Sequence, residues 1–267
     1  MKSSITFAMM ALNAITASAK PISNHRRATP TIYTCGDSTM AKDGAANGET
    51  DGWGQYLGNY TTGATVVNKA IAGRSARSYW EEGRFSDVAD LVVEGDIVVI
   101  EFGHNDGGTP ETDDNGRSDC PGEGEETCTS DADGSTVYTF VYYMTKAAQL
   151  FIEKGATVVL STQTPNNPWE TGSFLYAPPR FVGYQKTVAE AVNDASCTYV
   201  DHFNAVALMY EKLGDSTVTS YYPSDHTHTS PTGADMVAQA FVQAIATAMN
   251  GTTSLTDYVI SDYATVY

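Results

Sequence analysis

The chain has 267 residues, of which 42% are hydrophobic, so it can bury the core of one large domain or two small ones. Its 32 acidic residues outnumber its 15 basic residues and give a formal net charge of -17, which repels phosphate backbones and anionic lipids. We therefore expect neither nucleic acid nor a membrane as a partner. The four cysteines are too few for a disulfide scaffold, and no C-x-x-C or H-E-x-x-H spacing indicates a metal site.

The N-terminal residues predict secretion. The apolar and small residues 5–17 end in Ala17-Ser18-Ala19, which fits the small-x-small rule for signal-peptide cleavage. We interpret residues 1–19 as a signal peptide and the mature protein as extracellular. Arg26-Arg27 resembles a dibasic processing site, which makes residues 20–27 a candidate propeptide. No other segment is apolar enough to span a bilayer.

Five short apolar runs, rich in Val and Ile, are typical of strands that are covered on both faces. In chain order they are residues 31–35, 65–71, 96–102, 157–164 and 197–202. A helical pattern at residues 140–154 precedes the fourth run, and another at residues 180–193 precedes the fifth. A third, at residues 230–249, follows the fifth run. The alternation predicts a doubly wound α/β domain with a parallel sheet.

We assign residues 28–250 to this single domain. Its last helical pattern begins with Ser230 as the N-cap and Pro231 at the first helical position. The polar segment 107–134 is too long for an ordinary connection, so it is either an active-site loop or locally disordered. We assign no function to the polar tail, residues 251–267.

Polar clusters follow four of the five predicted strands. Gly36-Asp37-Ser38 follows the first strand, AGRSARS the second, GHNDGG the third and TPNNPWETG the fourth. Ligands of doubly wound sheets bind beyond the carboxyl ends of the strands. We therefore expect all four clusters at one edge of the sheet.

Ser38 allows two interpretations. Gly, Asp and Ser are common turn residues, so the tripeptide alone favours a turn, and the G-x-S-x-G of α/β-hydrolases is absent here. A serine nucleophile needs a base and an acid that orients the base. Asp225 and His228 lie close together before the last helix, and Asp225 could hold His228 with its Nε2 free for Ser38. His226 is a competing base, and a polar loop that caps the helix would explain the same residues.

Three hydrogen-bond donors could complete such a site by stabilising an oxyanion. They are the backbone amides of Ser38 and Gly73 and the side-chain amide of Asn105. Taken singly, Gly73 and Asn105 are ordinary turn residues. The agreement of four separate segments in order and in expected position favours the hydrolase interpretation.

These segments resemble the four blocks of the SGNH (GDSL-type) hydrolases, in the same order. The blocks are GDS with Ser38, AGRSARS with Gly73, GHND with Asn105, and DHTH with Asp225 and His228. The longer strings GDSTMAKDG, AGRSARSY, EFGHNDGG, TQTPNNPWETG and DHTHTSP are similar to those of the fungal rhamnogalacturonan acetylesterases within this family. The resemblance covers residues 31–250.

The resemblance implies a three-layer α/β/α, flavodoxin-like fold with a five-stranded parallel sheet. It implies that Ser38 is the nucleophile, His228 the base and Asp225 its orienting acid. Ser38, Gly73 and Asn105 would form the oxyanion hole. The implied activity is a secreted serine esterase that needs no cofactor and removes acetyl groups from the rhamnogalacturonan backbone of pectin through an acetyl-enzyme.

The cysteines are expected to fall into two classes. The resemblance implies a disulfide near Cys120 and Cys128, and a bond between them would order a segment that has little core. Cys35 and Cys197 lie in apolar runs, and we expect both to be free and buried. In a 2-1-3-4-5 sheet their strands are not neighbours, so the two thiols are too far apart to bridge.

Three residues are candidates for binding the substrate. Arg74 and Arg77 suit a galacturonate carboxylate, or they pair with Glu81 or Glu82. Trp169 either stacks on a sugar or anchors its own loop.

The expected partner is therefore an acetylated pectic polysaccharide, and we expect a monomer. Two other classes stay open: a broader carbohydrate esterase or lipase of the same fold, and a non-catalytic sugar-binding module. The polar strand-edge loops favour a short acyl group, and a binding module would not need Ser38, Asp225 and His228 together. The sequons at Asn59 and Asn250 permit N-glycans on a secreted chain.

Overall fold

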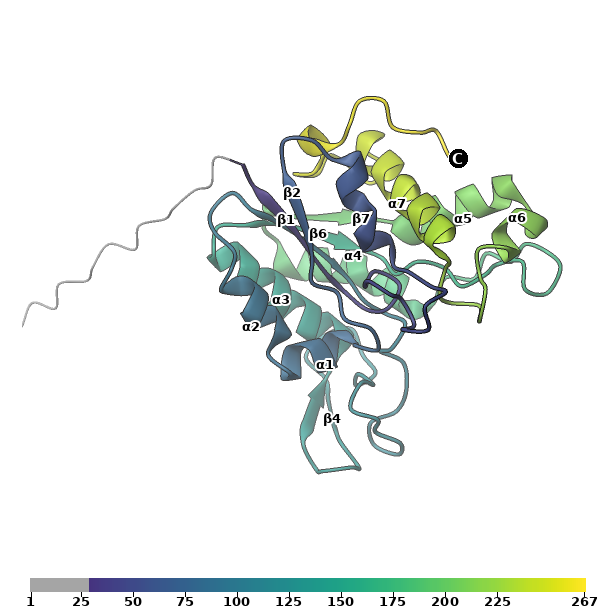
Figure 1. The fold of residues 1–267 in the computed structure, drawn as a ribbon. Helices are drawn as coiled ribbons and strands as arrows, with labels where there is room; N and C mark the ends of the chain where they lie inside the picture. Colours follow the sequence, from purple (N-terminus) through teal and green to yellow (C-terminus); the bar gives the residue numbers. More distant parts are fainter. Residues whose placement is uncertain (1–28) are drawn as a thin grey trace, which may run out of the picture.

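The computed structural model describes residues 29–267, so the predicted signal peptide and propeptide lie outside the described residues. A five-stranded parallel sheet with the order β2-β1-β3-β6-β7 forms the centre of the molecule (Figure 1). Its strands are β1 (Thr31–Gly36), β2 (Thr65–Asn68), β3 (Ile97–Glu101), β6 (Thr157–Ser161) and β7 (Cys197–Val200). The predicted α/β class, the five strands and the 2-1-3-4-5 order are confirmed.

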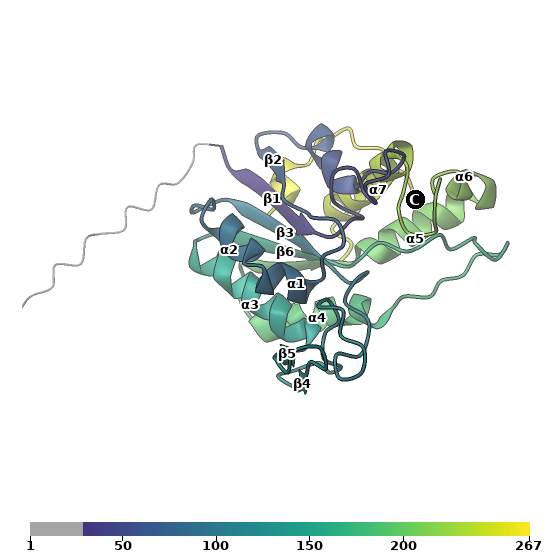
Figure 2. The same cartoon turned by 60° about the horizontal axis from the view of Figure 1, so that its bottom comes forward.

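Helices cover both faces of the sheet, as Figures 1 and 2 show from two directions. One layer consists of α1 (Ala76–Glu81), α2 (Arg84–Ala89), α3 (Phe140–Glu153) and α4 (Arg180–Val192). The other contains α5 (His202–Leu213), α6 (Asp215–Thr219), α7 (Pro231–Ala246), and the 3-10 turns η1 (Trp53–Gln55), η2 (Leu57–Tyr60) and η3 (Thr256–Tyr258). Within residues 29–267, no helix is long and apolar enough to cross a membrane.

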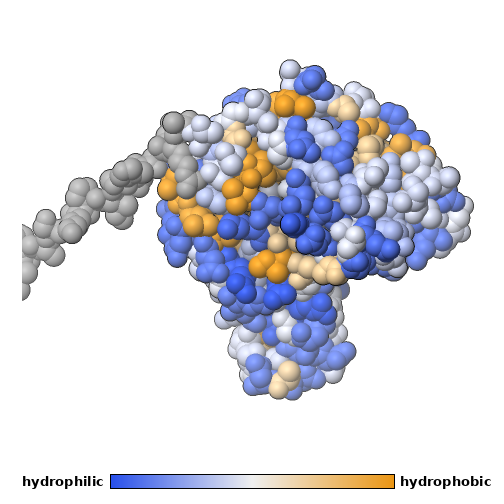
Figure 3. All heavy atoms as spheres, in the orientation of Figure 1, coloured by the Kyte–Doolittle hydropathy of each residue, from blue (hydrophilic) through white to orange (hydrophobic). Residues whose placement is uncertain are grey.

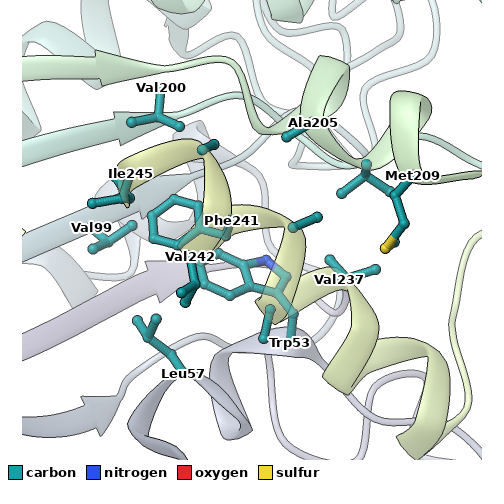
Figure 4. Packing of buried hydrophobic residues seen from close by; sticks show 14 of the residues in the cluster. Trp53, Leu57, Val99, Val200, Ala205, Met209, Val237, Phe241, Val242 and Ile245 are labelled. Atoms are coloured by element: carbon teal, nitrogen blue, oxygen red, sulfur yellow. The ribbon is translucent and has the colours of Figure 1, made fainter. Parts of the chain in front are cut away.

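Neighbouring residues of the central strands enter two different cores, because successive side chains of a strand point to opposite faces. Val99 lies in the core with Trp53 and Phe241 (Figure 4), whereas Val98 lies in the core with Phe85 and the helices α1 to α4. Both positions are fully buried. This double covering explains why the strands read as continuous apolar runs.

The predicted helices form with the expected N-cap. The Ser230 side chain accepts a hydrogen bond from the amide of Gly233 at 3.3 Å, and Pro231 is the first residue of α7. The sequence analysis placed no helix at α1, α2, α5 or α6. It also extended the fifth strand too far, because Asp201 is the N-cap of α5 and accepts from the amide of Asn204 at 3.0 Å.

The structure describes the long polar segment, residues 107–134, throughout. Its strand β4 (Thr127–Thr129) pairs in antiparallel fashion with β5 (Thr136–Tyr138), which lies just beyond the segment, and a disulfide joins Cys120 to Cys128. The hairpin projects from the helical layer, and its surface is mostly hydrophilic (Figure 3). Cys35 and Cys197 are free; Cys35 is buried, whereas Cys197 is only partly so.

A buried carboxyl group at the end of β3 joins the sheet to the layer that contains η1, α5 and α7. Glu101 is 1% exposed, and its Oε1 accepts from Trp53 Nε1 at 2.8 Å. Its Oε2 accepts from Ser161 Oγ at 2.5 Å and lies 2.9 Å from Nδ1 of the buried His202. His202 Nε2 donates to the carbonyl of Val237 at 3.1 Å. One side chain thus ties β3 to β6, η1 and α5, and through α5 to α7.

Replacing Glu101 with Ala should lower the free energy of unfolding by about 3–5 kcal/mol, because the donors of Trp53 and Ser161 lose their acceptor in a dry core and His202 loses its partner. Glu101→Gln keeps one acceptor oxygen, so its free energy of unfolding should lie between those of Glu101→Ala and the wild type. Glu153→Ala, on the exposed end of α3, is the control and should change the unfolding free energy by less than about 0.5 kcal/mol. Urea titrations that place Glu101→Ala beside the control would contradict this role.

Candidate active site

The loops that follow β1, β2 and β3 are joined to one another at the carboxyl edge of the sheet. The amide of Ile71, after β2, donates to the carbonyl of Gly36 at the end of β1 at 2.9 Å. The amide of Ala76 donates to Oδ1 of Asp106, after β3, at 2.7 Å. These bonds hold the three segments together, as the sequence analysis expected.

Ser38, His228 and Asp225 form one hydrogen-bonded chain at this edge. Ser38 Oγ lies 2.7 Å from His228 Nε2, and His228 Nδ1 lies 2.7 Å from Asp225 Oδ2. The other carboxylate oxygen, Oδ1, accepts the amides of Thr227 and His228, each at 2.7 Å. This geometry lets Nε2 take the hydroxyl proton while the carboxylate holds the imidazole by its other nitrogen.

Asp225 is held in its charged form. Partial burial favours the neutral carboxyl, but the hydrogen bonds from the amide and ring of His228 and from the amide of Thr227 outweigh it and lower the pKa of Asp225. The ionised carboxylate can therefore stabilise a positive charge on His228.

The other histidine of this loop is directed elsewhere. Nδ1 of His226 lies 3.1 Å from Oε1 of Glu170, and both side chains are exposed. The backbone carbonyl of His226 accepts from the amide of Asn167 at 2.7 Å, and the carbonyl of Thr229 accepts from the amide of Asp51 at 2.9 Å. The loop before α7 is thus fixed on both sides, with His228 toward Ser38.

The three candidate oxyanion donors differ in what they already bond. Within residues 29–267, neither the amide of Ser38 nor that of Gly73 donates to a protein acceptor. Gly73 has φ +76°, a left-handed conformation that glycine adopts without strain. Asn105 Nδ2 donates one hydrogen to the carbonyl of Arg74 at 3.1 Å, which leaves its second hydrogen available.

Two of the three candidate substrate-binding residues serve the protein itself. Arg77 is 3% exposed, and its guanidinium bonds Asp114 twice, at 2.8 and 3.0 Å, and Glu81 at 3.1 Å. Burial and these two carboxylates leave no free face for a substrate, so Arg77 belongs to a structural ion pair. Trp169 Nε1 donates to the carbonyl of Tyr210 at 2.9 Å, which anchors its loop.

Arg74 remains partly exposed and bonds Glu82 at 3.2 Å. Its backbone carbonyl accepts a hydrogen bond from the side-chain amide of Asn105.

A cleft of about 450 Å³ borders the third strand-end loop. Gly103, His104 and Gly107 of that loop form one wall, and the segment after β6 forms the other. The lining mixes apolar side chains with amides; its members include Phe181, Phe203, Leu175, Gln163, Asn166 and Asn167. Such a mixture suits a ligand with both apolar faces and hydroxyl groups.

The sequence analysis missed a pair of buried acids next to Asn105. Asp106 and Asp119 are 0% and 1% exposed, and the amide of Asp119 donates to the backbone carbonyl of Asp106 at 3.0 Å. Burial raises the pKa of Asp106 to about 7; the amide of Ala76 opposes this shift and the charge of Asp37 adds to it. Burial, and then the charge of Asp106, raise the pKa of Asp119.

Comparison with known proteins places this site among acyl hydrolases. Residues 34–236 match the model of the GDSL-like Lipase/Acylhydrolase family. The chain is 51% identical over 233 residues to the rhamnogalacturonan acetylesterase of Emericella nidulans, covering 85% of this chain and 91% of that protein. It is 27% identical over 221 residues to a probable rhamnogalacturonan acetylesterase of Bacillus subtilis, YesY, covering 80% of this chain and 91% of that protein.

A solved structure supports the fold. The Bacillus subtilis protein YxiM superposes with a TM-score of 0.65 at 22% identity, covering 83% of this chain. The present chain spans 57% of the length of that structure.

The Asp106–Asp119 pair predicts a pH-dependent stability. An unfolded aspartate releases its proton near pH 4, whereas folded Asp106 keeps its proton to about pH 7, so the unfolding free energy should fall as the pH rises between these values. The slope is at most about 1.4 kcal/mol per pH unit for one proton. Asp119→Asn should reduce the slope of the unfolding free energy against pH. The new side-chain amide can donate a hydrogen bond to an ionised Asp106, and this bond lowers the pKa of Asp106 toward its unfolded value.

Urea unfolding across this pH range measures the slope. Asp113→Asn, which removes an exposed carboxylate from the same segment, is the control and should keep the wild-type slope. Parallel curves for the wild type and Asp119→Asn would refute the assignment.

Proposed function

Since the chain belongs to the GDSL-like lipase/acylhydrolase family, we propose that it is a secreted serine esterase that removes acetyl groups from the rhamnogalacturonan of pectin. The observation that carries the proposal is the continuous hydrogen-bonded chain from Ser38 through His228 to Asp225. The 51% identity to a rhamnogalacturonan acetylesterase supports the substrate.

The reaction begins when Ser38 Oγ attacks the acetyl carbonyl and His228 Nε2 takes the hydroxyl proton. Negative charge moves to the carbonyl oxygen, which the amides of Ser38 and Gly73 and the free hydrogen of Asn105 Nδ2 stabilise. Asp225 stabilises the imidazolium. The tetrahedral intermediate collapses, His228 gives the proton to the departing sugar hydroxyl, and an acetyl group remains on Ser38.

Water completes the cycle by the same route. His228 takes a proton from the attacking water, the second tetrahedral intermediate forms at the same donors, and its collapse returns the proton to Ser38 Oγ. Acetate leaves and the enzyme is restored. The chain's own residues supply every proton transfer in this scheme.

The same proposal covers the parts of the chain around the catalytic domain, residues 28–250. Residues 1–19 act as a signal peptide and residues 20–27 as a propeptide, and the mature enzyme works outside the cell as a monomer. Asn59 and Asn250 carry N-glycans; both side chains are exposed. Asn250 accepts the amide of Asp201 through Oδ1, which keeps its Nδ2 available for a glycan.

Released acetate measured on a panel of esters tests the function. The wild type should have a higher kcat/KM on acetylated rhamnogalacturonan than on p-nitrophenyl acetate or octanoyl esters, since binding energy from remote sugars raises the rate only when those sugars are present. Ser38→Ala should lose about 10⁴-fold or more in rate with an unchanged unfolding transition. Activity within about tenfold of wild type would end the serine-esterase proposal, and a preference for acetylated xylan would end the pectin assignment.

The two histidines of the loop before α7 provide a matched pair. His228→Ala should reduce kcat by about 10³-fold or more, because its Nε2 lies against Ser38. His226→Ala should stay within about tenfold of wild type, because that ring contacts Glu170. The opposite ranking, measured with p-nitrophenyl acetate, would move the base to His226.

A further inference from the structure

Arg117 is a positive charge without a carboxylate partner in a strongly acidic chain. Among residues 29–267, Arg74, Arg77 and Arg84 each lie within 4.0 Å of an acidic side chain, whereas Arg117 and the exposed Arg180 have none at this distance. Its guanidinium is half-buried and makes one hydrogen bond, from Nη1 to Oδ1 of Asn105 at 3.3 Å.

The segment that carries Arg117 is fixed to the loop that carries Asn105. Ser118 Oγ donates to the carbonyl of Gly107 at 3.1 Å, and the amide of Asp119 donates to the carbonyl of Asp106 at 3.0 Å. The buried Arg77 donates to the carbonyl of Ser118 at 3.0 Å. The position of Arg117 beside Asn105 is therefore set by the two residues that follow it, Ser118 and Asp119.

The contact with Arg117 also orients the amide of Asn105. Oδ1 faces the guanidinium and Nδ2 faces the carbonyl of Arg74, so the side chain cannot exchange its two ends without placing donor against donor. The remaining N–H groups of Arg117 form a planar fork, which matches the two oxygens of a carboxylate. No described acidic side chain occupies that fork.

We propose that Arg117 binds the carboxylate of a uronic acid unit of the substrate backbone, while its Nη1 holds the Asn105 amide. The inference rests on the proposed function, which places the acetyl carbonyl at Asn105. The residue would thus join recognition of an acidic polymer to the oxyanion donors. The sequence analysis assigned this role to Arg74 and Arg77; Arg77 is occupied by Asp114 and Glu81.

Inhibition of p-nitrophenyl acetate hydrolysis tests the site with two ligands that differ in one group. The first is a deacetylated rhamnogalacturonan oligosaccharide, and the second is the same oligosaccharide with its carboxylates reduced to alcohols. Arg117→Ala should raise the inhibition constant of the first ligand about tenfold to hundredfold, the usual effect of losing a charge-assisted bond. For the second ligand the constant should change by less than about threefold.

Two variants control for charge and folding. Arg117→Lys keeps the positive charge but lacks the planar fork of N–H groups. Its inhibition constant for the acidic oligosaccharide should lie between those of Arg117→Ala and the wild type. Lys154→Ala removes one positive charge at the end of α3, just before β6 begins at the opposite edge of the sheet, and should leave both constants unchanged.

The proposal is wrong if the acidic oligosaccharide does not inhibit the wild type, if Arg117→Ala leaves its inhibition constant unchanged, or if the constant rises equally for both ligands. Failure of the proposed function is a separate observation: the wild type would then release no acetate from acetylated rhamnogalacturonan. The inhibition assay uses p-nitrophenyl acetate as its substrate, so the two failures are distinguishable.

Discussion

The carboxylate of Glu101 sits in the dry centre of the molecule, and the active-site edge is built outward from it. Glu101 is the last residue of β3, and its side chain accepts hydrogen bonds from Trp53 and Ser161 and lies against His202. It therefore contacts the last residue of β6 and the first residues of η1 and α5. The loop that carries Asn105 starts at the next residue, Phe102. A carboxyl group buried at this depth is tolerated only when neighbouring groups form hydrogen bonds with it. That requirement leaves little freedom in how the surrounding segments are arranged.

Acidic side chains organise the rest of the edge in the same way. Asp106 accepts the first amide of α1, and Asp225 accepts two successive amides in the loop before α7. Asp37 accepts both the amide and the hydroxyl of Thr39, which shapes the turn that carries Ser38. The turn chemistry expected of this segment is thus present, and the same turn places Ser38 against His228. The nucleophilic role of Ser38 stays a prediction. Part of the acidic excess consists of internal acceptors rather than surface charge.

The sequence predicted what depends on local pattern and on strand order. Continuous apolar runs identified the five strands because both faces are covered, and parallel strand ends then brought Ser38 and Asn105 to the edge where His228 lies. Partners distant in the sequence were not predictable. Arg77 bonds Asp114 across 37 positions, and no spacing distinguishes that pairing from one with a substrate. Helix α5 was missed because its N-cap, Asp201, follows a strand without an intervening turn signal.

Under the proposed function an acidic enzyme acts on an acidic polymer, so binding must rely on short-range contacts rather than on attraction at a distance. The net charge of -17 opposes approach, and at physiological ionic strength screening limits that repulsion to about 8 Å. Within that range the nearest charge on the protein determines whether a substrate carboxylate is attracted or repelled. A half-buried guanidinium is screened less than the surface carboxylates around it. One unpaired arginine beside the reacting carbonyl can therefore outweigh a general repulsion at the place where binding energy affects the rate.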